Sequence, residues 1–136
     1  MRRNLLFFDH EESLHEVYRG MFLNRPEFVV YTAKELDIAG NIVRRVPLEL
    51  IIMSVPSVGF AVQDVLRFAK HANEKAKRRV ILVSSSYIKE YARLYDIDAT
   101  GALDALAKPF GTNDLMHLID RVLPSKKMKI EIPDGF

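Results

Sequence analysis

Short apolar runs alternate with longer amphipathic segments along almost the whole chain. The apolar runs cover residues 4–8, 28–31, 48–53, 80–83 and 103–107, and their length and composition predict five β-strands. The third run is apolar except for Glu49, which is typical of a strand that is covered on both faces. Strands that alternate with helices in this way predict an α/β fold, a doubly wound parallel sheet with helices on both faces.

The segments between and after these runs have apolar residues at helical spacing, which predicts one helix after each strand. The first helix is expected at residues 11–23, and Thr32 and Thr112 are expected to cap the second and fifth helices at their N-termini. The residues expected to face the core are Leu14, Val17, Tyr18 and Met21 in the first helix, Leu36, Ile38, Ile42 and Val43 in the second, Val62, Val65, Leu66 and Ala69 in the third, Ile88, Tyr91, Ala92 and Tyr95 in the fourth, and Leu115, Leu118, Ile119 and Val122 in the fifth.

Pro124 is expected to end the last helix and, with it, the folded domain. We therefore predict one domain at residues 1–124 and a C-terminal tail at residues 125–136. The tail is polar at first and then alternates Met128, Ile130 and Ile132 with polar residues, so it is either a loose tail or an added strand. It is too short to hold a DNA-binding or enzymatic output domain, so any output is expected to pass through a partner.

Composition adds limits on function. The chain has 136 residues, 49% hydrophobic and 28% charged, with a formal net charge of +2, as expected for one soluble domain. No cysteine is present, which removes disulfides, thiol nucleophiles and thiolate metal sites. No apolar stretch is long enough for a membrane span, and Asp9 interrupts the first run too early for a signal peptide. We expect a cytoplasmic protein with no membrane contact and no dedicated nucleic-acid surface.

Candidate chemistry lies just after the predicted strands. In doubly wound sheets, ligands bind at the carboxyl ends of the strands, where the strand order reverses. The residues expected there are Asp9, His10, Glu11 and Glu12 after the first strand, Ser54 after the third, Ser84 and Ser85 after the fourth, and Lys108 and Pro109 after the fifth.

On these residues the sequence resembles the receiver domains of bacterial two-component response regulators, the CheY-like family. The most specific stretch is 101–110, where a Gly-Ala pair, a strand and the Lys108-Pro109-Phe110 ending occur in the family's order. The resemblance covers residues 4–123. It implies a five-stranded flavodoxin-like (βα)5 sheet of order 2-1-3-4-5 and a role in phosphorelay signal transduction.

The resemblance also implies a site for Mg²⁺-assisted phosphoryl transfer onto an aspartate. The family pattern has two acids after the first strand, the phosphoacceptor aspartate at the end of the third, a Ser or Thr after the fourth and a Lys after the fifth. Asp9, Ser84 and Lys108 match this pattern, whereas His10 replaces the second acid and Ser54 replaces the acceptor. A serine cannot form an acyl phosphate, and two neutral side chains in place of carboxylates weaken an Mg²⁺ site.

A third departure affects the residue that reports phosphorylation in the family. Receivers commonly carry an aromatic residue three positions before the strand-five lysine, and Ala105 occupies this place. A methyl group has no rotamer to switch. The sequence therefore predicts a degenerate receiver, or pseudo-receiver, that is not an enzyme, has no cofactor, binds Mg²⁺ weakly or not at all, and acts by protein–protein contact.

The expected partner is a histidine kinase or an output protein. Receivers usually bind through the face of the fourth helix, fifth strand and fifth helix, which also offers a surface for a homodimer. In this sequence the face is expected to include Lys89, Arg93, Tyr95, Asp104, Asn113 and His117.

Other interpretations of the same residues stay open. Asp9 is as well explained as a residue that caps the first helix. A metal pair of His10 and His15 lacks a third ligand, and Ser54 as a nucleophile lacks an oriented base and oxyanion donors. Two further functions are a conventional receiver that accepts phosphate at an unexpected group, and a nucleotide- or flavin-binding protein. The second is disfavoured because no glycine-rich phosphate loop follows the first strand.

Overall fold

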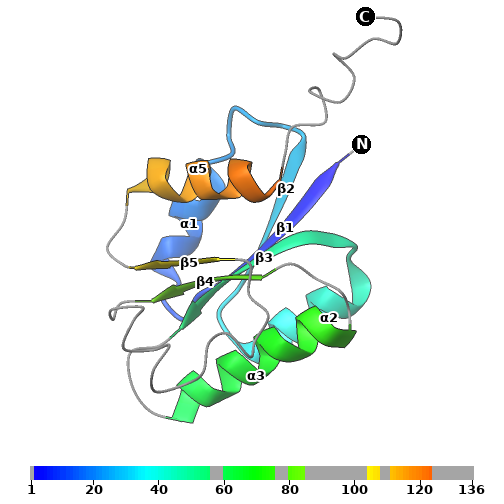
Figure 1. Ribbon diagram of the computed structural model, residues 1–136. Coiled ribbons are helices and arrows are strands. Elements are labelled where there is room, and N and C mark those ends of the chain that lie inside the picture. The colour runs from blue at the N-terminus through cyan, green and yellow to red at the C-terminus, as the bar shows by residue number, and fades with distance from the viewer. Residues whose placement is uncertain (1, 56–59, 76–79, 85–103, 108–110, 124–136) are drawn as a thin grey trace, which may run out of the picture.

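The sheet predicted from the sequence is present. The structure, a computed structural model, describes residues 2–55, 60–75, 80–84, 104–107 and 111–123. It contains a five-stranded parallel sheet of order β2-β1-β3-β4-β5, which confirms the expected fold class (Figure 1). The strands are β1 (Arg3–Phe8), β2 (Phe28–Ala33), β3 (Leu48–Val55), β4 (Val80–Ser84) and β5 (Asp104–Ala107).

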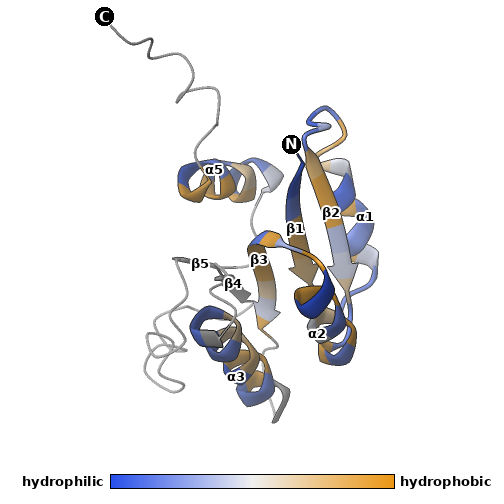
Figure 2. Cartoon of the chain, turned by 90° about the vertical axis from the view of Figure 1, so that its right-hand side faces the viewer, coloured by the Kyte–Doolittle hydropathy of each residue, from blue (hydrophilic) through white to orange (hydrophobic). Residues whose placement is uncertain are grey.

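Helices cover both faces of this sheet. The helices α1 (Ser13–Gly20) and α5 (Thr112–Val122) lie on one face, and α2 (Leu36–Arg45) and α3 (Phe60–Lys75) lie on the other (Figure 1). Each face has its own buried apolar cluster, and in Figure 2 the helices carry hydrophobic and hydrophilic stripes. The fourth predicted helix and the tail lie outside the described residues.

Alternation along β1 assigns each of its side chains to one of the two clusters. Leu5 and Phe7 pack toward α1 and α5, whereas Leu6 and Phe8 pack toward α2 and α3. The next two residues continue this alternation, so Asp9 contacts α1 and His10 lies beside α2. Neighbouring side chains at the end of β1 therefore serve opposite faces of the sheet.

One irregularity occurs in the pairing of β1 with β3. Asn4 pairs with Leu48 and Leu5 pairs with Leu50, so Glu49 is an extra residue on β3. The Glu49 carboxylate accepts a hydrogen bond and ion pair from Arg3 Nε at 2.6 Å. Leu48 and Leu50 belong to opposite core clusters because this bulge shifts the alternation.

Several local expectations were wrong. The helix α1 ends at Gly20, earlier than expected, because residues 21–24 form turns. Thr32 lies inside β2 and bonds to Arg19, and the N-cap position of α2 is Glu35. Thr112 is the first residue of α5; the N-cap is Gly111, whose amide donates to the Asp114 carboxylate at 3.1 Å.

Two apolar residues expected in the core lie at the surface. Val17 on α1 is 43% exposed and Ile38 on α2 is 42% exposed. The position toward the core near Val17 is taken by His15, which is buried together with Tyr18. Helical periodicity alone did not predict that His15 is buried and Val17 exposed. The burial of His15 is compensated by a side-chain hydrogen bond, described below.

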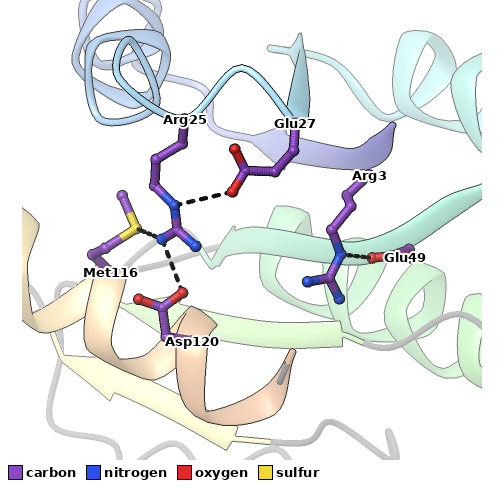
Figure 3. A network of polar contacts seen from close by, with 6 residues as sticks. All are labelled: Arg3, Arg25, Glu27, Glu49, Met116 and Asp120. Atoms are coloured by element: carbon purple, nitrogen blue, oxygen red, sulfur yellow. Dashed lines mark hydrogen bonds and ion pairs between the residues drawn. The ribbon is translucent and has the colours of Figure 1, made fainter. Parts of the chain in front are cut away.

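A cluster of polar contacts joins α5 to the turn before β2 (Figure 3). The Arg25 guanidinium forms ion pairs with Asp120 at 2.9 Å and Glu27 at 3.6 Å, and it contacts the Met116 sulfur. It also lies over the Phe28 ring, 4.7 Å from the ring centroid. One side chain thus connects α5, the turn and the first residue of β2.

We expect Arg25→Ala to lower the free energy of unfolding by about 1–2 kcal/mol, from one cation–π contact and partly exposed ion pairs. Urea unfolding followed by circular dichroism measures this loss. Arg67→Ala, which removes an arginine that is 74% exposed on α3 and has one 3.6 Å ion pair, is the control and should cost less than about 0.5 kcal/mol. Equal losses for the two variants would show that the contacts of Arg25 contribute nothing specific.

Candidate functional site

The strand ends that carry the predicted site residues lie side by side. Phe8 pairs with Met53, next to Ser54, and Val55 pairs with Ser84. Ser84 in turn pairs with Ala107, the last residue of β5. The structure therefore brings the chain at positions 9, 54 and 84 to one edge of the sheet. Lys108 lies outside the described residues, as do Lys89, Arg93 and Tyr95.

Asp9 is a buried residue whose carboxylate is held on both oxygens. It is 1% exposed. Its Oδ1 accepts a hydrogen bond from the Glu11 amide at 3.0 Å, and its Oδ2 accepts one from the Tyr18 hydroxyl at 2.5 Å. The hydrogen bond from the Glu11 amide, two residues further along the chain, closes a turn that leads into α1. The expectation that Asp9 caps the first helix is wrong, because Glu12 occupies the N-cap position and the bond of Asp9 goes to the turn before the helix.

Tyr18 is positioned for this contact by packing. Its ring stacks on Phe7, with centroids 4.5 Å apart, within the cluster shared by α1 and α5. Burial, then the hydrogen bond and charge of Asp9, raise the pKa of the Tyr18 hydroxyl well above its usual value. The hydroxyl therefore stays protonated and remains a donor to Asp9.

His15 adds a second connection between α1 and the end of β1. Its side chain is buried, and its Nε2 lies 2.9 Å from the Asp9 backbone carbonyl. Because a carbonyl only accepts, Nε2 carries the proton and donates it. His15 thus satisfies a backbone group and does not face His10, as the helical register predicted.

His10 lies on the other face of the sheet. Its ring packs edge-on against Phe8, with centroids 5.0 Å apart, and it is exposed at the end of a groove beside Leu36 and Val65. Asp9 and His10, which the sequence resemblance aligns with the paired acids of receivers, therefore have different surroundings.

Ser54 is buried within β3, at 6% exposure, and β3 continues to Val55. By alternation from Leu50 and Ile52 it falls on the α1 and α5 face, the same face as Asp9. Glu49 is at the other end of β3 in its ion pair with Arg3, and Asp64 on α3 pairs with Arg67. Neither acid substitutes for a carboxylate at position 54.

The residues at this edge do not fit an Mg²⁺ site. Such an ion needs carboxylate oxygens in octahedral arrangement, whereas positions 10 and 54 carry an imidazole and a hydroxyl. Both oxygens of Asp9 already accept hydrogen bonds. Among the residues that the structure describes, no three His, Asp or Glu side chains are grouped to hold a metal.

Only part of the expected partner-binding face is described. Asn113 and His117 are exposed on α5. Asp104 and Ala105 belong to β5, where the backbone pairs with Ile81 and Leu82. No helix in the described ranges is long and apolar enough to cross a membrane.

Tyr18 is the site residue that sequence reasoning missed. Its spacing in α1 predicted a core position, which is correct, but its hydroxyl was not assigned a partner. A useful signal was available: a buried tyrosine needs an acceptor, and nine residues separate it from Asp9 at the end of the adjacent strand.

No protein-family model matches the sequence, and no curated protein matches it. Solved structures do match. A response regulator from Thermotoga maritima superposes with a TM-score of 0.76 at 20% identity, over 92% of this chain and 100% of its own. The chain has the fold of a response regulator receiver domain.

Two further receiver-fold structures have the same extent. The chemotaxis protein CheY4 of Vibrio cholerae gives a TM-score of 0.75 at 21% identity, over 90% of this chain and 100% of its own. An orphan response regulator of H. pylori gives a TM-score of 0.70 at 20% identity, over 90% of this chain and 99% of its own. The receiver fold thus accounts for nearly all of the chain, at identities that establish architecture alone.

We expect Tyr18→Phe to lower the free energy of unfolding by about 1–3 kcal/mol, because it removes a donor from a buried carboxylate. Denaturant unfolding measures this effect. Tyr31→Phe is the matched control, since Tyr31 is only partly buried and packs against the other core cluster. The bond is not important for stability if the two variants unfold alike.

Proposed function

We propose that this chain is a receiver-like signalling module that does not use aspartyl phosphorylation and that works by binding another protein. The observation that carries the proposal is the edge formed by Asp9 and Ser54. Ser54, at the position that the family resemblance assigns to the acceptor, has a buried hydroxyl, and the Asp9 carboxylate accepts hydrogen bonds from Tyr18 and the Glu11 amide.

The chemistry of the acceptor supports this proposal. A carboxylate that receives a phosphoryl group gives a mixed anhydride, which hydrolyses readily and reacts with hydroxylamine. A serine hydroxyl gives a phosphate ester, which does neither. Ser54 would also need a base to remove its proton, and Asp9 is already an acceptor for two other donors. A phosphorylation cycle based on an acyl phosphate is therefore not supported at this edge.

Binding partners would have to recognise the folded surface itself. Histidine kinases and output proteins are the partner classes that the receiver fold suggests, and the exposed side chains of Asn113 and His117 on α5 are part of the surface proposed for them. A conventional receiver that accepts phosphate at another group is the second candidate, and the same experiment separates the two.

The test is incubation of the purified protein with Mg²⁺ and acetyl phosphate, followed by intact mass measurement with and without hydroxylamine. We expect no added phosphate. Added mass that hydroxylamine removes would overturn the proposal in favour of the conventional receiver. Fluorescence of the released supernatant after denaturation also tests for a bound flavin.

Two triple variants test whether the hydrogen bond from Tyr18 to Asp9 restricts phosphorylation at this edge. In the double variant His10→Asp, Ser54→Asp, the acids are restored but the Asp9 oxygen remains bonded to Tyr18. We expect Mg²⁺-dependent, hydroxylamine-labile phosphate to rise when Tyr18→Phe is added to this double variant, since the substitution releases Oδ2. Adding Tyr31→Phe instead is the control. Equal labelling of both triple variants would show that Tyr18 does not restrict the site.

A further inference from the structure

Two adjoining cavities form one groove between α2 and α3. The first, of about 410 Å³, reaches from His10 to Leu36 and Asp37, and the second, of about 490 Å³, continues from Leu36 and Asp37 toward Arg44. The lining residues are His10, Glu35, Asp64 and Val65 at one end, Leu36 and Asp37 in the middle, and Gly40, Asn41, Arg44, Phe68 and His71 at the other end.

Gly40 lies on α2 between Asp37 and Arg44, and its lack of a side chain leaves this part of the groove open. A Cβ atom at this position would lie 3.8 Å from the Phe68 ring and 3.5 Å from the Arg44 guanidinium, both ordinary contacts. Alanine would therefore fit, and it would favour a helix by about 1 kcal/mol. Packing inside the chain therefore does not explain the glycine, and the bare backbone at this point would permit close approach by another molecule. Ile38, 42% exposed, is on the same helix.

Charges are separated along this surface. Glu35 and Asp37 lie at the amino end of α2, and Arg44 and Arg45 lie in its last turn. Asp64 of α3 lines the acidic end of the groove, whereas the second half of α3 carries both Lys70 and Glu74. In the part of the chain that the structure describes, the ion pairs leave out Glu35, Asp37, Arg45 and Lys70. Most of these charges are thus available to a molecule that docks on the groove.

A two-fold axis through the centre of such a surface places its acidic end on the basic end of another copy. A two-fold interface uses the same patch on both chains, so a patch with opposite charges at its ends is complementary to itself. The helix dipoles of the two copies are then antiparallel as well. Nucleic acid would be repelled by the acidic half, and an acidic peptide would meet the same repulsion.

We propose that the α2–α3 groove is a homodimer interface, in which two copies pack antiparallel across Gly40. The inference stands apart from the proposed function, because it concerns neither the phosphorylation edge nor the α5 face. If the experiment on one proposal fails, the other proposal is unaffected.

Sedimentation velocity of the whole chain tests the dimer. Two variants are needed: an acid-end variant, Glu35→Lys with Asp37→Lys, and a base-end variant, Arg44→Glu with His71→Glu. We expect the unmodified protein to be a dimer at low salt and to dissociate as salt rises. Each variant alone should dimerise about tenfold more weakly or worse, because like charges meet across the axis.

The decisive measurement is the equimolar mixture of the two variants. One variant then has two basic ends and the other two acidic ends, so the mixture should form a heterodimer although each component alone is monomeric. Circular dichroism confirms that both variants are folded. An exchange of charges on α1, Glu16→Arg with Arg19→Glu, is the control and should leave dimerisation unchanged.

Gly40→Gln gives an independent check, since it fills the groove without changing charge. It should weaken the dimer while the chain stays folded. The proposal is overturned if the unmodified protein is monomeric at every salt concentration, if the single variants dimerise as well as it does, or if the mixture fails to associate.

Discussion

Burial of the central strands on both faces is the constraint on which the rest of the structure depends. The side chains of β1 and β3 alternate between two apolar clusters, so α1 and α5 must cover one face and α2 and α3 the other. The same alternation sends Asp9 to Tyr18 and His10 to the groove beside α2. The arrangement of the polar edge is therefore a consequence of core packing.

Physical reasons explain which features could be predicted from the sequence. Apolar runs predict strands well, so all five predicted strands are present. Their order agrees with the one that the family resemblance implied. Helix ends depend on single capping contacts, and there Thr32 and Thr112 were assigned wrongly. The surface position of Val17 was missed because His15 takes the buried place and compensates with a bond to a backbone carbonyl.

The candidate site, too, could be predicted only in part from the sequence. The positions of Asp9, Ser54 and Ser84 along the strands followed from the pattern of the chain, and the structure places these strand ends together. The hydrogen bond from Tyr18 could not be predicted in the same way, because it depends on how α1 packs against Phe7. Because of that bond, we interpret Asp9 as a structural residue that connects β1 to α1, and no longer as an acid left over from a phosphorylation pocket.

The bulge at Glu49 has a consequence at the far end of the sheet. A one-residue slip of β1 against β3 would exchange the faces of every later side chain on the slipped strand. Arg3 holds the extra residue in place by its bond to Glu49, and the strand ends are about 20 Å away at roughly 3.3 Å per residue. This ion pair at the amino end of the sheet thus adds to core packing in stabilising the register that keeps Asp9 beside Tyr18 and His10 on the opposite side.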